Sequence, residues 1–384
     1  MSGPLRVGVV GAGWGAGLHL EGFRRTGRVR LAVLTSRTRE RAEQLAARFG
    51  VEEVADSLDE LIEKVDVVSV ATPPDAHHDA VLRAAAAGRQ VLCDKPVAVR
   101  ADQAREMLEA AEKAGVVHAT GFVWRYDPAF AAMARAVAAG AIGRPLHVRV
   151  ASVMGLPPLP YNWMYRREDG GGALMQHGSH VLDRIRVLLG EELTVVRGEL
   201  HHDLREAEDG PRFHHVLEVF DWARRNPAPV GSAKGLPVTA DTGYELSGTT
   251  ASGVRVSVYE AWHASSRVEE SFAVHGTEGS LEWSGADGLV LLRPGRDPEA
   301  VDVPGGGSSS GTGAAREHGL MLWHRFADSF VTAVGTRGGH PAASGPEPEG
   351  TAAGPLPTLD DGLQVMRIVE AVHASHRSRH EEQV

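Results

Sequence analysis

Short apolar runs alternate with runs of helix-forming residues over positions 1–123. The apolar runs occupy residues 5–10, 30–36, 65–71, 90–94 and 116–121. Helical segments follow them, one ending at Phe23 and others at residues 39–50, 76–87 and 101–115. Strands that alternate with helices form a parallel sheet covered on both faces. The pattern therefore predicts an α/β fold whose first domain, residues 1–123, is a doubly wound parallel sheet.

A different pattern begins near residue 147. Longer strand-like runs lie at residues 147–153, 192–200, 243–262, 267–276 and 279–283, and helical spacing returns at 317–335 and 359–379. Strands in hairpin-like succession predict a large, mostly antiparallel sheet with one open face. We therefore expect residues 124–384 to form a second α/β domain. Residues 305–315 and 338–357 are rich in Gly, Pro and Ser and are expected to be mobile loops.

Composition narrows the class of protein. The chain has 384 residues, 42% of them hydrophobic, and a formal net charge of −10. A negative chain has little general affinity for nucleic acid or anionic membranes, although a local basic pocket is still allowed. The single cysteine, Cys93, forms no internal disulfide, which fits a reducing compartment. We therefore expect a cytoplasmic protein.

A glycine-rich turn follows the first apolar run. Gly11 and Gly13 stand at the first two positions of a G-x-G-x-x-[GA] pattern, Ala16 stands at the third, and Trp14 lies between them. The glycines allow a tight turn and close approach of a pyrophosphate, which binds at the N-terminus of the next helix. We therefore expect a dinucleotide here. The alternative is a glycine-rich turn without a ligand.

The end of the second apolar run indicates which dinucleotide binds. An NAD site usually has a carboxylate there to hold the ribose 2′-hydroxyl. This chain has Ser36 and Arg37, with Arg41 one helical turn further on. A guanidinium matches a 2′-phosphate in charge and geometry. We therefore expect NADP(H) to be preferred, with NAD(H) as the alternative. The arginines could also be solvated at a helix start.

Three further segments give the chain a resemblance to a known family. They are A-T-P-P-D-A-H at residues 71–77, D-K-P at 94–96, and G-G-G-A-L-M-Q-H-G-S-H at 170–180. With the glycine turn, and in this order, they resemble the Gfo/Idh/MocA oxidoreductases. The resemblance implies an N-terminal Rossmann domain and a C-terminal α/β domain with an open sheet. It also implies hydride transfer between nicotinamide and a hydroxyl or keto carbon of a sugar, cyclitol or related polyol.

The resemblance also implies roles for particular residues. Lys95 and His180 match the family's catalytic lysine and histidine. The cofactor-binding residues it implies are Ala71, Thr72, Pro73, His77, Asp94, Lys95 and Pro96. The substrate-binding residues are Lys95, Arg125, Trp163, Tyr165, Gln176 and His180, with Arg166 near cofactor or substrate. By the same resemblance, a homodimer or homotetramer is expected.

The chemistry of these residue types agrees with those roles. Alcohol oxidation needs a base near the hydroxyl and a donor that polarises the carbonyl. A lysine after a buried strand, near a cationic nicotinamide, has its amine form favoured, and histidine transfers protons at neutral pH. The alternatives are a solvated Lys95 and a satisfied core His180.

Histidines 177, 180, 201, 202, 214 and 215 lack a tight ligand frame, so no metal is expected.

Gln176 departs from the family pattern, which usually has aspartate there. An amide donates and accepts hydrogen bonds but carries no titratable proton. The proton route must then run through His180, Lys95 or Tyr165, or turnover has been lost. Asp183 either orients His180 or lies on a helix surface. Two rival functions follow. The first is a different enzyme, either a sugar-modifying enzyme with retained cofactor or a keto-sugar or imine reductase. The second is a non-catalytic NADP(H)-binding regulator.

Overall fold

The computed structural model describes most of the chain. The described residues are 3–13, 15–155, 157–211, 222, 225–226, 235–263, 269–303, 312–338 and 354–384. Trp14, expected at the cofactor, lies outside this part, as do residues 305–311 and 339–353 of the two expected loops. Residues 312–315 were also expected in a loop, but they form the first turn of helix α9 (Thr312–Gly338).

The N-terminal part is a parallel sheet in Rossmann order. Within the described residues it has six strands in the order β3-β2-β1-β4-β5-β6, all paired in parallel. Their bounds are β1 Leu5–Val10, β2 Val29–Thr35, β3 Glu53–Ala55, β4 Val67–Val70, β5 Gln90–Cys93 and β6 His118–Thr120. The strand order reverses between β1 and β4, and ligands of such sheets bind in the crevice at that point.

Helices cover both faces of this sheet, because its strands are apolar on both sides. They are α1 Ala16–Thr26, α2 Arg39–Phe49, α3 Leu58–Lys64, α4 His77–Ala86 and α5 Ala101–Ala114. Val7 and Val9 pack in one cluster with α1 and α2, and Val10 packs in the other with α3, α4 and α5. Trp323, Phe326 and other α9 residues join the first cluster. Residues beyond the expected boundary at 123 thus complete the core of the N-terminal sheet.

The C-terminal part is a mixed, mostly antiparallel sheet. In the described part it has nine strands in the order β16-β15-β14-β13-β7-β12-β11-β8-β17, and only β7 and β12 pair in parallel. The bounds are β7 Pro145–Val153, β8 Leu193–His201, β11 Gly243–Thr250, β12 Arg255–Ala261, β13 Glu269–Gly276, β14 Ser280–Ser284, β15 Gly288–Leu292, β16 Glu299–Ala300 and β17 Glu382–Gln383. A separate antiparallel pair joins β9 (Glu206–Ala207) and β10 (Leu236–Pro237).

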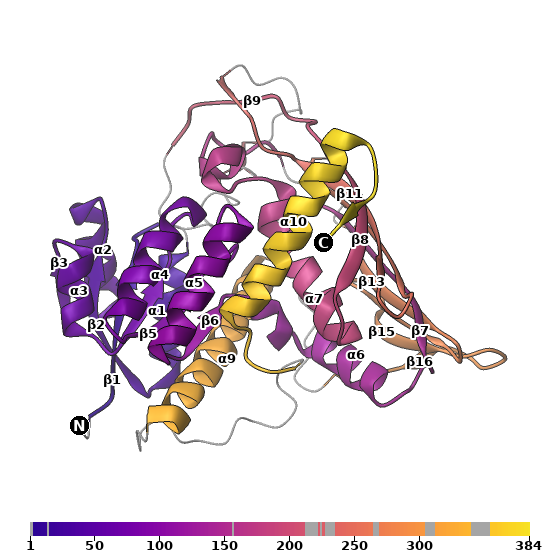
Figure 1. Cartoon of the computed structure of the whole chain (residues 1–384), viewed down its shortest axis with the longest axis horizontal. Coiled ribbons are helices and arrows are strands. Elements are labelled where there is room, and N and C mark those ends of the chain that lie inside the picture. Colours follow the sequence, from indigo (N-terminus) through magenta and orange to yellow (C-terminus); the bar gives the residue numbers. More distant parts are fainter. Residues whose placement is uncertain are drawn as a thin grey trace.

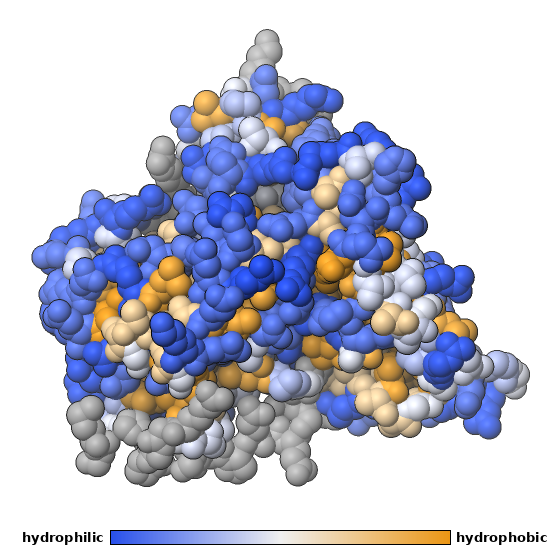
Figure 2. Space-filling model, in the orientation of Figure 1, coloured by the Kyte–Doolittle hydropathy of each residue, from blue (hydrophilic) through white to orange (hydrophobic). Residues whose placement is uncertain are grey.

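One face of this sheet is covered by helices α6 (Pro128–Ala138), α7 (Ser179–Leu189) and α10 (Leu359–Ser378), as Figure 1 shows. Side chains alternate along β12, so Val256, Val258 and Glu260 are buried on the covered face while Tyr259 points outward. Helix α10 runs between α5 and β8 and connects the two halves (Figure 1). Polar residues cover most of the face seen in Figure 2, with hydrophobic ones in separate patches.

The predicted fold class is confirmed. The structure adds the short elements β3, α3 and β15 and also the helices α6 and α7, which the hydrophobic pattern did not separate from their neighbours. Among the described residues, no helix is long and apolar enough to cross a membrane.

Candidate active site

The first pocket lies at the carboxyl ends of β1, β2 and β4, where the strand order reverses. It is lined by Val10 to Gly13, by Thr35 to Thr38 with Arg41, and by Ala71 to Pro73. Gly11 has φ +113°, and a Cβ there would lie 2.6 Å from the Ala71 carbonyl oxygen. Helix α1 begins at Ala16 with no acidic residue in its first turn, so its N-terminal N–H groups favour an anion. These features fit the pyrophosphate of a dinucleotide.

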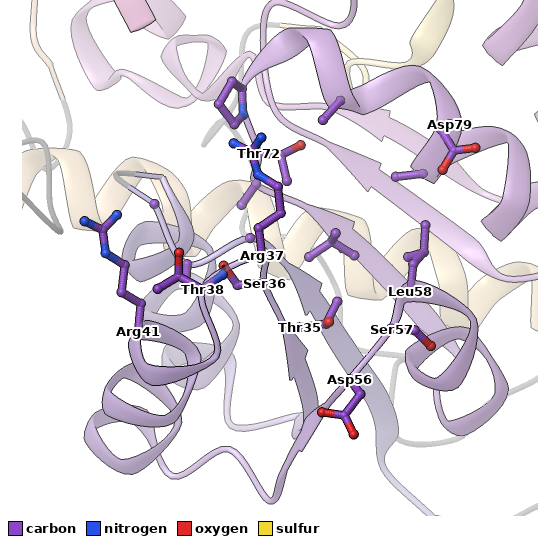
Figure 3. Close-up of a pocket in the computed structure, with 18 of the residues that line it drawn as sticks. Thr35, Ser36, Arg37, Thr38, Arg41, Asp56, Ser57, Leu58, Thr72 and Asp79 are labelled. Atoms are coloured by element: carbon purple, nitrogen blue, oxygen red, sulfur yellow. Dashed lines mark hydrogen bonds between the residues drawn. The ribbon is translucent and has the colours of Figure 1, made fainter. Parts of the chain in front are cut away.

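Two arginines near the end of β2, one on the connection to α2 and one in the first turn of α2, have no ion-pair partner among the described residues. Figure 3 shows Arg37 and Arg41 beside Ser36 and Thr38, away from Asp56 and Asp79. Neighbouring arginines are paired: Arg39 with Glu43 at 2.9 Å, and Arg83 with Asp79 at 3.0 Å. Within the described residues, neither Arg37 nor Arg41 has an ion pair or a side-chain hydrogen bond. The positions expected to hold a 2′-phosphate therefore keep their donors free.

His77 lies behind this pocket instead of along it. Its side chain is fully buried, with Nε2 2.8 Å from the Thr72 carbonyl oxygen and Nδ1 3.1 Å from that of Pro96. It lines neither of the two pockets at this site. The expectation of direct cofactor contact is therefore wrong for His77, because its ring is consumed in joining two loops. Burial lowers the pKa of His77, so the ring is neutral at neutral pH.

The second pocket shares Ala71, Thr72 and Pro73 with the first and extends toward the C-terminal sheet. Lys95, Gln176 and His180 all line it, so three separate segments of the chain meet there. Lys95 follows β5, and its Nζ donates to the Gln176 backbone oxygen at 2.7 Å, with Gln176 Oε1 at 3.4 Å. Burial lowers the pKa of Lys95, although the charges of Asp94 and Glu260 oppose the effect. The sequence prediction that these residues form one site is consistent with this geometry.

Asp94 is held in place from several sides. Its Oδ1 accepts from the Lys95 backbone N–H at 2.8 Å, and its Oδ2 lies 3.3 Å from His19 Nε2. Burial would raise the pKa of Asp94, but His19 and the charge of Lys95 outweigh it and keep the pKa below its usual range. A Cβ at Gly15 would lie 2.9 Å from Oδ2, so the carboxylate also faces the start of α1.

The triple glycine forms a close-packed turn. Gly172 has φ +112°, and a Cβ there would lie 2.2 Å from Asp241 Oδ1. Asp241 Oδ2 accepts from the Leu174 N–H at 2.9 Å and so caps the turn that carries Gln176. That turn, Leu174–Gly178, is π-helical and leads into α7; such turns often occur at functional sites. Burial raises the pKa of Asp241 to about 7.

Gln176 is oriented by its amide nitrogen. Nε2 donates to the Gly170 carbonyl oxygen at 2.8 Å, which turns Oε1 toward Lys95. The side chain therefore offers Lys95 an acceptor without a charge or a proton. His180, the other predicted catalytic residue, stacks on Trp124 with ring centroids 4.6 Å apart and planes 6° apart. Burial, with the charge of Lys95, holds the pKa of His180 well below its usual value, so His180 is neutral.

One histidine–carboxylate pair in this pocket was missed by sequence reasoning. His177 lines the pocket, and its Nδ1 lies 2.9 Å from Oε2 of the fully buried Glu260. Glu260 Oε1 also accepts from Trp262 Nε1 at 2.8 Å. A signal was present in the sequence, because Glu260 continues the alternation of Val256 and Val258 on β12 and so occupies an inward position.

Arg125 is not a substrate residue in this structure. It is 1% exposed and does not line the pocket; its guanidinium donates to Asp183 at 2.8 and 2.5 Å and lies 2.7 Å from Asp361. Asp183 is likewise buried, and both of its carboxylate oxygens accept from Arg125, so it neither orients His180 nor lies on a helix surface. The expectations for Arg125 and Asp183 are therefore wrong, because the Arg125 side chain is buried against Asp183 and Asp361. The pocket is lined by its neighbour Trp124 instead.

The residues just before the glycines also differ in whether they line the pocket. Trp163 and Tyr165 line the second pocket, as expected, but Arg166 lines neither site pocket and pairs with Asp169. The Tyr165 hydroxyl accepts from the Leu159 N–H at 2.9 Å, and burial raises the pKa of Tyr165. A tyrosine that keeps its proton is a poor relay, so the expected Tyr165 route is disfavoured.

In the described part of the chain, no group of three His, Cys, Asp or Glu residues could hold a metal.

The fold and this two-pocket site place the chain among dinucleotide-fold oxidoreductases, and comparison with known proteins agrees. Residues 5–122 match the oxidoreductase family with an NAD-binding Rossmann fold, and residues 130–282 match the GFO/IDH/MocA C-terminal domain. The chain belongs to the Gfo/Idh/MocA oxidoreductase family.

Two curated relatives and one solved structure illustrate the similarity. The chain is 36% identical over 190 residues to 1,5-anhydro-D-fructose reductase of Ensifer adhaerens, covering 49% of this chain and 57% of that protein. It is 30% identical over 256 residues to levoglucosan dehydrogenase of Pseudarthrobacter phenanthrenivorans, covering 65% and 63%. The matches thus span less than two thirds of either relative. An NAD binding oxidoreductase from Klebsiella pneumoniae superposes with a TM-score of 0.77 at 26% identity, covering 99% of both chains.

Proposed function

We propose that the chain is an NADP(H)-dependent oxidoreductase acting on the hydroxyl or keto carbon of a neutral sugar, cyclitol or related polyol. The observation that carries this proposal is the meeting of Lys95, Gln176 and His180 in a pocket that shares Ala71 to Pro73 with the glycine-turn pocket. A bound nicotinamide would supply hydride donation or acceptance. The names of the two curated relatives support a sugar-like substrate.

Lys95 has the properties of the group that holds the substrate oxygen. Its ammonium already donates to one oxygen at 2.7 Å and has two further protons for hydrogen bonds. Gln176 holds this ammonium, and Asp94 holds the Lys95 backbone N–H. An ammonium beside the substrate oxygen polarises a carbonyl and stabilises a developing alkoxide. Lys95 therefore acts on the oxygen, and Gln176 positions Lys95.

The pocket lining favours a neutral substrate. Trp124, Trp163, Trp262 and Trp323 line it, and such rings stack on the apolar faces of sugar rings. Among the described residues that line this pocket, Lys95 is the only lysine or arginine. A phosphorylated or nucleotide-linked sugar would bring negative charge that a single lysine leaves largely unpaired. The chemistry fits inositols, anhydrosugars and simple glycosides.

Cofactor preference is tested by fluorescence titration with NADPH and NADH. We expect the native protein to bind NADPH at least about tenfold more tightly, which is about 1.4 kcal/mol. Arg37→Ala should remove most of the difference, because it deletes a guanidinium available to the 2′-phosphate. Arg48→Ala is the matched control: it removes the same charge from the far end of α2, where Arg48 lies over the Phe49 ring. Equal or tighter NADH binding would overturn the NADP(H) assignment, and binding of neither would overturn the oxidoreductase.

We also propose a homodimer or homotetramer formed through the open face of the nine-stranded sheet. Outward-facing Arg149, Arg197, Glu199 and Glu245 surround Tyr259, which is 37% exposed. Mixed charges around an aromatic residue suit self-complementary packing. Light scattering should give two or four times the 40.9 kDa chain mass, and Tyr259→Lys should reduce it. A monomeric native protein would contradict this proposal.

A further inference from the structure

We propose that His177, held by the buried carboxylate of Glu260, accepts the proton of the substrate hydroxyl, in place of a carboxylate at position 176. This inference rests on the proposed function and assigns its proton-transfer group. It also makes Glu260 a positioning residue that acts through His177.

The geometry selects one ring nitrogen of His177 for this task. An ionised carboxylate only accepts hydrogen bonds, so the 2.9 Å contact with Glu260 Oε2 requires a proton on Nδ1. Nε2 then carries the lone pair, and it is the ring nitrogen left for the pocket that His177 lines. The Trp124 ring meets His177 edge-on, with centroids 4.7 Å apart, and limits its rotation. His177 is thus a histidine base in the orientation that the reaction needs.

Glu260 lies inside the protein with a donor on each of its carboxyl oxygens. It is 0% exposed, and burying a carboxylate is costly unless it is paired and hydrogen-bonded. Its two oxygens are divided between two donors, Trp262 Nε1 and His177 Nδ1. A carboxylate held this way stabilises the imidazolium that forms when Nε2 takes a proton. Its charge also reaches Lys95, whose pKa it helps to raise against the effect of burial.

Gln176 and His180, the two residues predicted for catalysis beside Lys95, are less suited to receive the proton. Gln176 is an amide, and its NH₂ is occupied by the Gly170 carbonyl oxygen. His180 stacks on Trp124, and its Nδ1 is buried without a hydrogen-bond partner in the described residues. Burial and the charge of Lys95 disfavour a positive charge on His180, as does Arg184, whose guanidinium lies 4.6 Å from the Trp124 ring centroid. His177, in contrast, has the buried carboxylate of Glu260 as its partner.

Proton transfer to His177, together with hydride transfer to the nicotinamide, accounts for both hydrogens that leave the alcohol. Oxidation of a secondary alcohol releases one hydride from carbon, which goes to oxidised nicotinamide, and one proton from the hydroxyl. The O–H bond breaks as the proton moves to His177 Nε2, and the oxygen lone pair forms the carbonyl. Lys95 keeps its own protons and hydrogen-bonds the oxygen throughout. The imidazolium then returns its proton to water, and in the reductive direction the same proton protonates the alkoxide.

The tautomer of His177 tests the inference without any substrate. In ¹⁵N-histidine-labelled native protein, the His177 signals, assigned by their loss in His177→Gln, should show Nδ1–H and a bare Nε2. In Glu260→Gln, we expect Trp262 Nε1 to donate to the amide oxygen, as it donates to Oε1 of Glu260. The amide NH₂ group then faces His177 Nδ1. The proton is then forced onto Nε2 and the spectrum should show the opposite tautomer. A native His177 that already carries its proton on Nε2 would overturn the proposal.

Kinetics on the full chain supply the second test. For any inositol, anhydrosugar or methyl glycoside that the native protein oxidises, His177→Gln and Glu260→Gln should each lower kcat about 10²- to 10⁴-fold. KM and NADPH affinity should change less than about threefold. His275→Gln is the control, since His275 has a similar side-chain partner, Ser280 at 2.8 Å, outside this pocket.

The two proposals fail in different ways. Near-native kcat in His177→Gln, with the native protein active, would overturn this inference alone. A native protein that binds NADPH yet oxidises nothing on the panel would overturn the proposed activity and this inference together. If both variants lose NADPH binding as well as activity, the pair is structural and the inference fails.

Discussion

Replacing Arg125 tests whether this residue stabilises the fold or binds substrate. The change Arg125→Met removes a guanidinium that is 1% exposed and makes two hydrogen bonds to Asp183, at 2.8 and 2.5 Å. Asp183 would keep only Arg186, whose Nη1 is 3.7 Å away. Removing one partner of a buried ion pair costs about 3–5 kcal/mol, because the other charge stays buried without compensation. That is a large share of a typical stability of about 5–15 kcal/mol.

Urea unfolding followed by tryptophan fluorescence measures this loss. The double variant Arg125→Met with Asp183→Leu should recover much of it, since it removes both charges, and the cycle gives their coupling energy. Arg100→Met is the matched control: Arg100 pairs with Asp102 at the surface and should cost less than about 1 kcal/mol. A cost for Arg125→Met below about 1 kcal/mol, together with a clear rise in KM, would refute this reasoning and return Arg125 to the substrate site.

Two further predictions concern the turn that carries Gln176. The folded pKa of Asp241 is about 7 and its unfolded value about 3.9, so its contribution to stability is full below pH 4 and lost as pH rises through 7. Thermal unfolding of native protein and Asp241→Asn at pH 5 and 8 should show the native protein losing more stability between them, by about 2–3 kcal/mol, since roughly two pKa units separate pH 5 from the folded pKa; equal losses would contradict the shift. Gly172→Ala should cost more than about 2 kcal/mol, because it adds a Cβ 2.2 Å from Asp241 Oδ1 to the strain of a positive φ. Gly253→Ala, with φ +88° and open space, should show the strain alone, and equal costs would exclude the clash.

Local sequence was sufficient for the elements and for much of the cofactor pocket. Hydrophobic periodicity is a property of neighbouring residues, so it predicted the alternation of β1, β2, β4, β5 and β6 with helices and most strands of the second sheet. The glycine turn and the arginines after β2 share one pocket because parallel strands bring their carboxyl ends to the same edge. Lys95, Gln176 and His180 were grouped by family resemblance, and the tertiary structure brings them into one pocket.

Side-chain direction and long-range pairing were decided only by the tertiary structure. Trp124 and Arg125 are adjacent in sequence, yet one lines the pocket and the other is buried against Asp183 and Asp361, a residue 236 positions further along the chain. His77 turned inward for the same reason, since its partners are backbone oxygens of two loops. Glu260 reaches His177 only because β12 lies in the sheet below the turn before α7. Hydrophobic pattern specifies which face of an element is buried, but a charged group inside the protein takes its partner from whatever the packing of distant segments brings within hydrogen-bond distance.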